Sequence, residues 1–100
     1  MPFFVYRLIS PRLTFPADIT DTERTLMQAH GAYWRGVMEK DGSVVALGPV
    51  ADPRGTYGLG ILEVNDLAEA ERLIAGDPAL KGNAGFSSEC HPMLSGLVRR

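Results

Sequence analysis

The chain has 100 residues, a length that suits one globular domain, and we expect residues 1–100 to form a single hydrophobic core. Its formal net charge is −2 and its ten Lys and Arg residues are scattered, so the sequence lacks the basic patch of a nucleic-acid-binding protein. The one cysteine, Cys90, excludes an internal disulfide and favours a reducing, cytoplasmic location.

The first half of the chain predicts a strand, a loop and a helix. Residues 3–9 are aromatic and β-branched and end at Ser10-Pro11, which is typical of a strand. This apolar start is too short for a membrane span, and it has no basic residues before it, so we expect no signal peptide. A loop at 11–19, without an obvious polar cluster, leads to Thr20 and Glu23, which form the capping box of a helix over about 21–40. Gly42 follows as a left-handed C-cap.

This helix is amphipathic. One stripe holds most of its large apolar side chains together with a histidine: Leu26, Met27, His30, Tyr33, Trp34, Val37 and Met38. The opposite side holds Arg24, Gln28, Arg35 and Glu39. Gly31 and Gly36 weaken the helix, and we interpret them as points of close backbone packing.

The second half predicts a hairpin, a second helix and a last strand. Residues 43–50 and 56–64 are strands, separated by a turn at 51–55. Asn65 and Asp66 can cap a helix that ends at Gly76, and Asp77-Pro78 begins a further short turn. After the loop at 81–85, residues 86–94 form the fourth strand, with Pro92 marking an edge or an end.

The element order βαββαβ predicts an α+β fold of the ferredoxin-like type, a four-stranded antiparallel sheet with both helices on one face. On the other face the first strand exposes apolar residues, either Phe3, Val5 and Ile9 or Phe4, Tyr6 and Leu8. An exposed apolar patch of this kind marks an interface, so we expect a homodimer joined through the open sheet face. The alternative is that the C-terminal tail folds back over it.

His30 and Asp77 are the candidate catalytic pair. The two helices run antiparallel in this fold, so the end of the second lies near the beginning of the first. His30 is about halfway along the first helix, and the second helix is only about half as long, so its end need not pass His30. A carboxylate bonded to one imidazole nitrogen fixes the tautomer and leaves the other nitrogen as a base. The alternatives are a structural histidine in the core and a plain helix-cap aspartate. The expected lining of a pocket beside the pair is Tyr6, Trp34, Gly48, Pro49 and Tyr57.

Other residues that could take part in catalysis or ligand binding form no recognisable site. Cys90 and His91 are neighbours on a strand and point to opposite faces, so they cannot act as a nucleophile and its base. Glu89 and His91 share a face, but two ligands do not make a metal site. The glycines at 55, 58 and 60 lack the lysine and the following helix of a phosphate loop. We therefore expect no metal and no cofactor.

The chain resembles the YciI-related (YCII) family. The resemblance lies in the aromatic first strand, His30, the segments at 41–42 and 47–49, Asp52 and Gly55, the acidic second helix, and the segments at 75–78 and 85–86. It implies a dimeric α+β barrel, and it implies that His30 and Asp77 correspond to the family's proposed active-site pair. It also implies enzymatic activity, since a relative removes HCl from a chlorinated hydroquinone without a cofactor. The Gly-rich loop at 81–85 departs from the family pattern, in which aromatic residues are often found.

Three hypotheses follow. The first is a cofactor-free lyase or isomerase that acts on a small molecule, with His30 as base and Asp77 as the residue that orients it. The second is a non-catalytic ligand-binding or assembly module in which His30 is structural. The third, drawn from the fold alone, is a cofactor-free monooxygenase.

Overall fold

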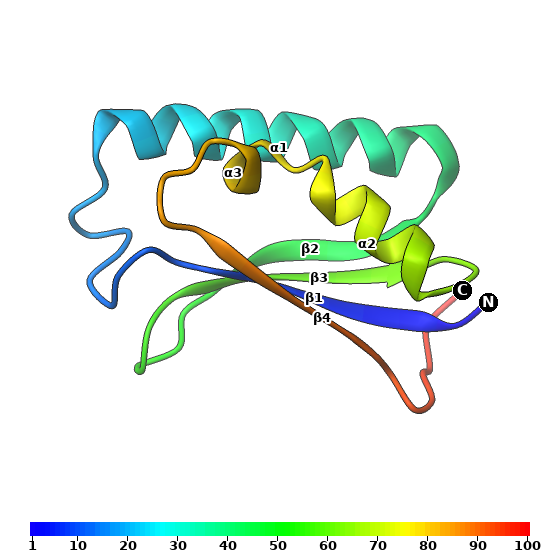
Figure 1. Ribbon diagram of the computed structural model, residues 1–100. Helices are drawn as coiled ribbons and strands as arrows, with labels where there is room; N and C mark the ends of the chain where they lie inside the picture. Colours follow the sequence, from blue (N-terminus) through cyan, green and yellow to red (C-terminus); the bar gives the residue numbers. More distant parts are fainter.

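A four-stranded antiparallel sheet forms one layer of the molecule and the helices form the other (Figure 1). The computed structural model describes residues 1–100. The strands are β1 (Phe3–Ile9), β2 (Val44–Val50), β3 (Tyr57–Glu63) and β4 (Ser87–Pro92), and the helices are α1 (Asp21–Asp41), α2 (Leu67–Ala75) and α3 (Pro78–Lys81). The sheet order β2-β3-β1-β4 confirms the predicted ferredoxin-like arrangement.

The central strand β1 decides which side chains form the core. Phe4, Tyr6 and Leu8 are buried beneath the helices, whereas Phe3, Val5 and Ile9 point to the open face and are only partly covered. Because successive side chains alternate across a strand, this choice also fixes the facing side chains of β3 and β4.

Local signals set the ends of the helices as the sequence predicts. The hydroxyl oxygen of Thr20 accepts a hydrogen bond from the backbone N–H of Glu23, and the Glu23 carboxylate accepts one from the backbone N–H of Thr20. Gly42 ends α1 with a φ of 72°, which is the left-handed C-cap. Asp66 caps α2 through the backbone N–H of Glu69, 2.8 Å away. No helix combines the length and the apolar character needed to cross a membrane.

Close backbone packing does not explain the two glycines inside α1, so that interpretation was wrong. A Cβ at Gly36 would meet no atom within 4 Å, and one at Gly31 would meet only the guanidinium of Arg35. Two glycines of β3 do make room for neighbouring side chains. Gly60 admits the ring of Tyr6, and Gly58 admits the side chain of Leu8.

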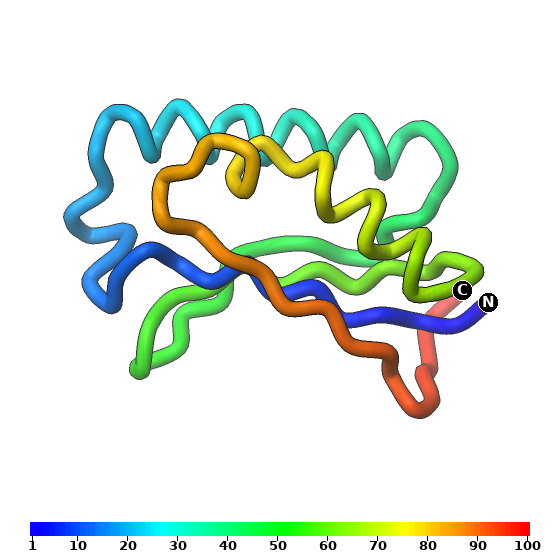
Figure 2. Tube along the Cα trace, in the orientation of Figure 1, coloured from blue at the N-terminus to red at the C-terminus, as the bar shows by residue number.

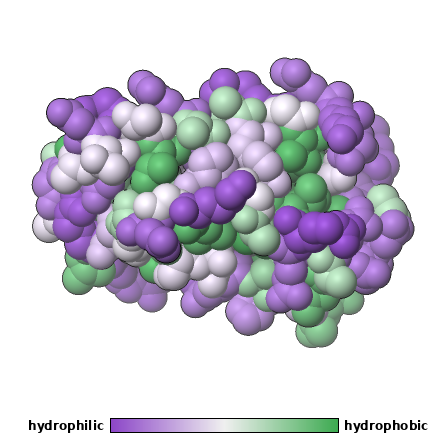
Figure 3. Space-filling view, turned by 45° about the horizontal axis from the view of Figure 1, so that its top comes forward, coloured by the Kyte–Doolittle hydropathy of each residue, from purple (hydrophilic) through white to green (hydrophobic).

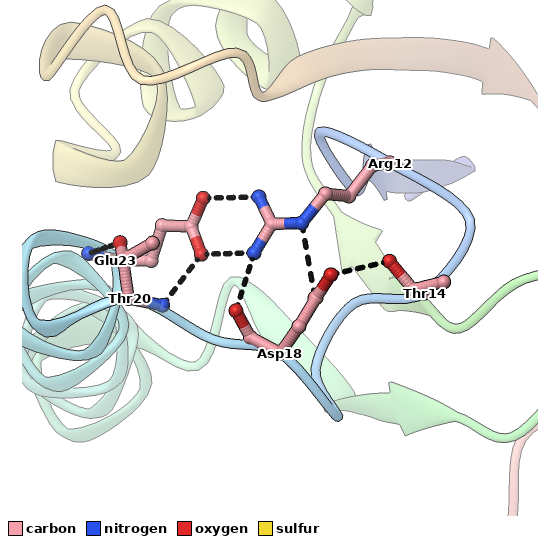
Figure 4. A network of polar contacts seen from close by, with 5 residues as sticks. All are labelled: Arg12, Thr14, Asp18, Thr20 and Glu23. Carbon is pink, nitrogen blue, oxygen red and sulfur yellow. Dashed lines mark hydrogen bonds and ion pairs between the residues drawn. The ribbon is translucent and has the colours of Figure 1, made fainter.

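The loop before α1 does contain a polar cluster, contrary to the sequence-based expectation (Figure 4). The guanidinium of Arg12 binds both carboxylate oxygens of Glu23, at 2.6 and 2.8 Å, and Asp18 through its side chain and its backbone carbonyl. The hydroxyl of Thr14 donates a hydrogen bond to Asp18. These partners are spread over twelve positions of the chain, so no local sequence pattern announced the cluster.

Two prolines lie in the sheet, and both are on its outer strands, where the missing backbone N–H is tolerated. Pro49 lies within β2 and Pro92 ends β4, and these are the outer strands. The strands are up to three residues shorter than predicted. Phe86 and Leu94, for example, lie outside β4.

The C-terminal tail covers only one end of the open sheet face. It turns back beside the N-terminus (Figure 2), where the backbone N–H of Met93 donates to the carbonyl of Phe3 at 2.9 Å and Gly96 packs against the Phe3 ring. Leu94 and Leu97 remain fully exposed. Seen obliquely from the helix side, the surface carries mainly hydrophilic residues, with hydrophobic residues in separate patches between them (Figure 3).

Candidate functional site

His30 and Asp77 lie in direct contact between α1 and α3. The Nδ1 atom of His30 is 2.7 Å from Oδ2 of Asp77 and 3.0 Å from Oδ1. An ionised carboxylate only accepts hydrogen bonds, so the proton of the neutral imidazole is on Nδ1 and the lone pair is on Nε2. Nε2 makes no hydrogen bond within the chain.

Asp77 is completely buried and accepts from three further donors. The hydroxyl of Tyr6 donates to Oδ2 at 2.7 Å, and the indole N–H of Trp34 donates to the same atom at 2.8 Å. The backbone N–H of Ala79 donates to Oδ1 at 2.9 Å, so Asp77 is also the N-cap of α3. The helix-cap role and the histidine-partner role are therefore present together.

Contacts between the helices bring Asp77 to His30. Tyr33 on α1 donates its hydroxyl proton to the carbonyl oxygen of Leu73, near the end of α2, at 2.6 Å. The same ring lies against Gly76, where any Cβ would collide with it. The chain then turns at Gly76, and the next residue is the aspartate. The turn at Gly76-Asp77-Pro78 thus places the Asp77 carboxylate beside the middle of α1.

The electrostatics of the cluster favour an ionised Asp77. Burial by itself raises the pKa of this carboxyl, but the hydrogen bonds from His30, Trp34, Tyr6 and Ala79 outweigh it and keep the pKa below its ordinary value. Burial, followed by the hydrogen bond to Asp77, raises the pKa of Tyr6. Tyr6 therefore stays protonated and acts as a fixed donor.

A cavity of about 510 Å³ lies beneath α1, next to His30. Its size is in the range of sites for small organic molecules. Its walls come from α1, from β1, β2 and β3, and from the loops that carry Ser10, Phe15, Thr56 and Phe86. Phe15 and Phe86 meet edge to face in one wall, with ring centroids 5.4 Å apart.

The expected pocket residues fall into two groups. Trp34, Gly48, Pro49 and Tyr57 line the cavity together with His30. Tyr6 does not line it and lies behind the pair as a donor to Asp77.

Arg35 also lines the cavity, although helical periodicity assigned it to the opposite side of α1. Side chains of a helix lean toward its N-terminus, and an arginine is long enough to reach back one turn. The missing side chain at Gly31, four residues earlier, is the sequence signal for this arrangement. A Cβ there would lie 3.1 Å from Nη2 of Arg35.

The remaining chemical candidates are separate from this cavity. Glu89 forms an ion pair with Arg7, 3.1 Å apart, on the open sheet face. Cys90 lies on the other side of β4, partly buried against the core, and burial raises its pKa. No three His, Cys, Asp or Glu residues are grouped so that they could hold a metal ion.

Comparisons with known proteins agree with this architecture. The family model described as the YCII-related domain matches residues 1–93. Among solved structures, the chain is similar to 5-chloro-2-hydroxyhydroquinone dehydrochlorinase (TftG) from Burkholderia phenoliruptrix AC1100, in complex with 2,5-dihydroxybenzoquinone. That similarity has a TM-score of 0.57 and 22% identity, and covers 89% of this chain and 91% of the other. None of the curated proteins matches.

At this identity the structural similarity shows a shared fold, and the fold is the ferredoxin-like form from which dimeric α+β barrels are built. The family match covers nearly the whole chain and includes both His30 and Asp77. The chain belongs to the family of YCII-related domains.

Proposed function

We propose that this protein is a small-molecule enzyme of the lyase or isomerase type that uses His30 as a general base and needs no cofactor. The proposal depends on one observation: the imidazole ring of His30 contacts a carboxylate at one nitrogen and also lines a cavity. Nδ1 is held by a buried carboxylate, and the ring lines a cavity large enough for a substrate.

The proposed chemistry begins with one proton transfer to His30. Nε2 of His30 takes a proton from a C–H or O–H group of the substrate. In an elimination, the electron pair left behind forms a double bond while an anion leaves from the neighbouring atom. In an isomerisation, the imidazolium returns the proton to a different atom. Asp77 faces the positive charge that develops on His30, and base catalysis of this kind contributes about 10²–10⁴-fold.

Chloride release tests the proposal. The first probe is 5-chloro-2-hydroxyhydroquinone, the compound in the name of the similar dehydrochlorinase. A panel of other halogenated phenols and enolisable ketones follows. The variants His30→Gln and Asp77→Asn are expected to lose about 10²-fold or more of any turnover found.

Asp66→Asn is the matched control, because Asp66 caps α2 as Asp77 caps α3 but contacts no histidine. It should keep full turnover. Turnover that survives both site substitutions would contradict the proposal. Consumption of dissolved oxygen with aromatic substrates would indicate the monooxygenase alternative instead.

A non-catalytic binding module is the second candidate, and the donors around Asp77 favour it. A buried carboxylate that receives a tyrosine, an indole and a backbone N–H stabilises the fold whether or not a reaction occurs. His30→Asn and His30→Gln separate the two candidates. Loss of turnover at unchanged thermal stability supports the enzyme. A loss of about 1 kcal/mol or more of unfolding free energy, with no turnover in either protein, supports the module.

We also propose that the protein acts as a homodimer joined through the open sheet face. Val5 and Ile9 of β1 lie on this face beside Ile61 and Tyr57 of β3, and the tail covers only one end of it. The charged residues Arg7 and Glu89 of the same face already pair with each other. A second copy is the occupant that buries the apolar strip without leaving these charges unpaired.

A further inference from the structure

Arg35 is a cation without a partner in the chain. Five other arginines form ion pairs, namely Arg7, Arg12, Arg24, Arg54 and Arg100. Arg35 makes no ion pair and donates no side-chain hydrogen bond, yet it lines the cavity next to His30. Gly31 leaves the space in which its guanidinium lies against the helix.

The rest of the cavity lining contains no group that neutralises the charge of Arg35. No aspartate or glutamate lines the cavity, and Arg35 is the only lysine or arginine that does. The walls are otherwise mainly apolar and aromatic, with Phe15, Trp34 and Phe86 among them. A guanidinium at the edge of an apolar cavity is attracted to a carboxylate or phenolate, because it can donate two parallel hydrogen bonds to such a group.

We infer that the cavity binds a small organic anion, with an apolar planar body between the aromatic walls and its negative group on Arg35. This inference rests on the proposed function in one respect, which is that the cavity beside His30 is the substrate site. It assigns Arg35 the role of a binding residue that selects negatively charged ligands. An anionic group held there also fixes which end of the ligand faces His30.

Binding of benzoate and benzamide tests the inference. The two probes have the same ring and nearly the same size, and only benzoate is charged. The chain has one tryptophan, so the indole N–H of Trp34 gives a single NMR signal from the cavity wall. Both titrations are made at the same pH, about 8, where the carboxyl group of benzoate is fully ionised.

Wild-type protein is expected to bind benzoate about tenfold more tightly than benzamide, as one charge-assisted contact at a partly exposed site provides. Arg35→Gln should remove this preference and leave benzamide binding unchanged, and Arg35→Lys should keep part of it. Arg72→Gln is the matched control, because Arg72 is an exposed helical arginine without an ion pair and lies outside the cavity. It should bind both probes as the wild type does.

Two results would overturn the inference: an unchanged benzoate preference in Arg35→Gln, or a Trp34 signal that neither probe shifts. His30→Gln separates this question from catalysis. Benzoate preference that persists in His30→Gln, in a protein without turnover, would leave the inference standing while the proposed function fails. Turnover that depends on His30 but not on Arg35 would support the proposed function and contradict the inference.

Discussion

At the scale of single residues, the ionised state of Asp77 depends on its donors. Each hydrogen bond to a buried carboxylate stabilises the charged form, and a lost donor leaves part of the burial cost uncompensated. Tyr6 and Trp34 lie far from Asp77 in sequence and supply two of these bonds. The aromatic residues of the core therefore act on the charge of the site as well as on packing.

Tyr6→Phe is expected to lower the free energy of unfolding by about 1–3 kcal/mol at neutral pH, because it removes one donor from a buried charge. The pKa of Asp77 is below its unfolded value, so the stability it provides is present above the ordinary aspartate pKa of about 3.9 and is lost as pH falls through the folded pKa. The difference between Tyr6→Phe and wild type should therefore shrink on acidification. Denaturant unfolding at several pH values measures it.

Tyr33→Phe is the control for this experiment, because Tyr33 donates to the neutral carbonyl of Leu73. Its smaller cost, about 0.5–1.5 kcal/mol, should show no comparable change between pH 7 and pH 3. Equal pH dependence in the two variants would show that the Tyr6 hydroxyl does not stabilise the ionised carboxylate.

Gly36→Ala should raise the free energy of unfolding by up to about 1 kcal/mol, because alanine favours the helix and the new methyl group meets no neighbour. Gly31→Ala gains the same helix propensity but must push the Arg35 guanidinium aside. We therefore expect Gly31→Ala to stabilise less and to weaken the benzoate preference. Thermal unfolding of both variants provides the comparison. A destabilised Gly36→Ala would mean that this side of α1 is covered in solution.

At the scale of elements, the loop before α1 is held by one ion-pair cluster (Figure 4). Glu23 is buried at the start of α1, and the hydrogen bonds from Arg12, followed by that from the backbone of Thr20, lower its pKa to about 2. The same loop carries Phe15, which is buried in the cavity wall against Phe86. The cluster therefore ties the position of a cavity wall to the first turn of the helix.

Arg12→Gln is expected to destabilise the protein, because it leaves the Glu23 carboxylate without its cation. The double variant Arg12→Gln/Glu23→Gln should recover part of this loss, because the uncompensated charge is gone. The contribution of Glu23 is complete above its unfolded pKa of 4.5 and disappears as pH falls toward 2. Unfolding of the single and double variants forms the cycle, and a coupling energy near zero would show that the pair is only a surface contact.

At the scale of the whole molecule, the helices cover one face of the sheet and the other face stays largely open. The helices shield the side of the sheet that carries Phe4, Tyr6 and Leu8, and the tail reaches only the end of the other side near Phe3. A chain of this size buries only part of its apolar surface by itself, and the proposed dimer would add to its stability.

Sedimentation at micromolar concentration should give about twice the chain mass of 10.9 kDa. Ile61→Glu introduces a charge in the middle of the open face, between Val5 and Ala46, and should give the mass of one chain. Arg24→Glu, on the exposed side of α1, should leave the mass of the dimer unchanged. A wild-type mass of one chain would refute the proposed assembly.

The sequence by itself determined the local elements and their order. Capping at Thr20, Asp66 and Gly42, the alternation of β1 and the turn residues are short-range effects, so they can be identified from neighbouring positions. The fold followed from the order of these elements. The proximity of His30 and Asp77 followed in turn, because antiparallel helices bring those two positions together.

Only the tertiary structure decided what surrounds that pair. The donors Tyr6 and Trp34, the clamp of Arg12 on Glu23 and the reach of Arg35 over Gly31 depend on side-chain length and on contacts across the fold. Helical periodicity gives the direction in which a side chain leaves the helix. It does not give how far a flexible side chain extends, so it placed Arg35 on the wrong side. Hydrogen bonds between positions about 40 to 70 residues apart become visible only when the strands and helices are packed.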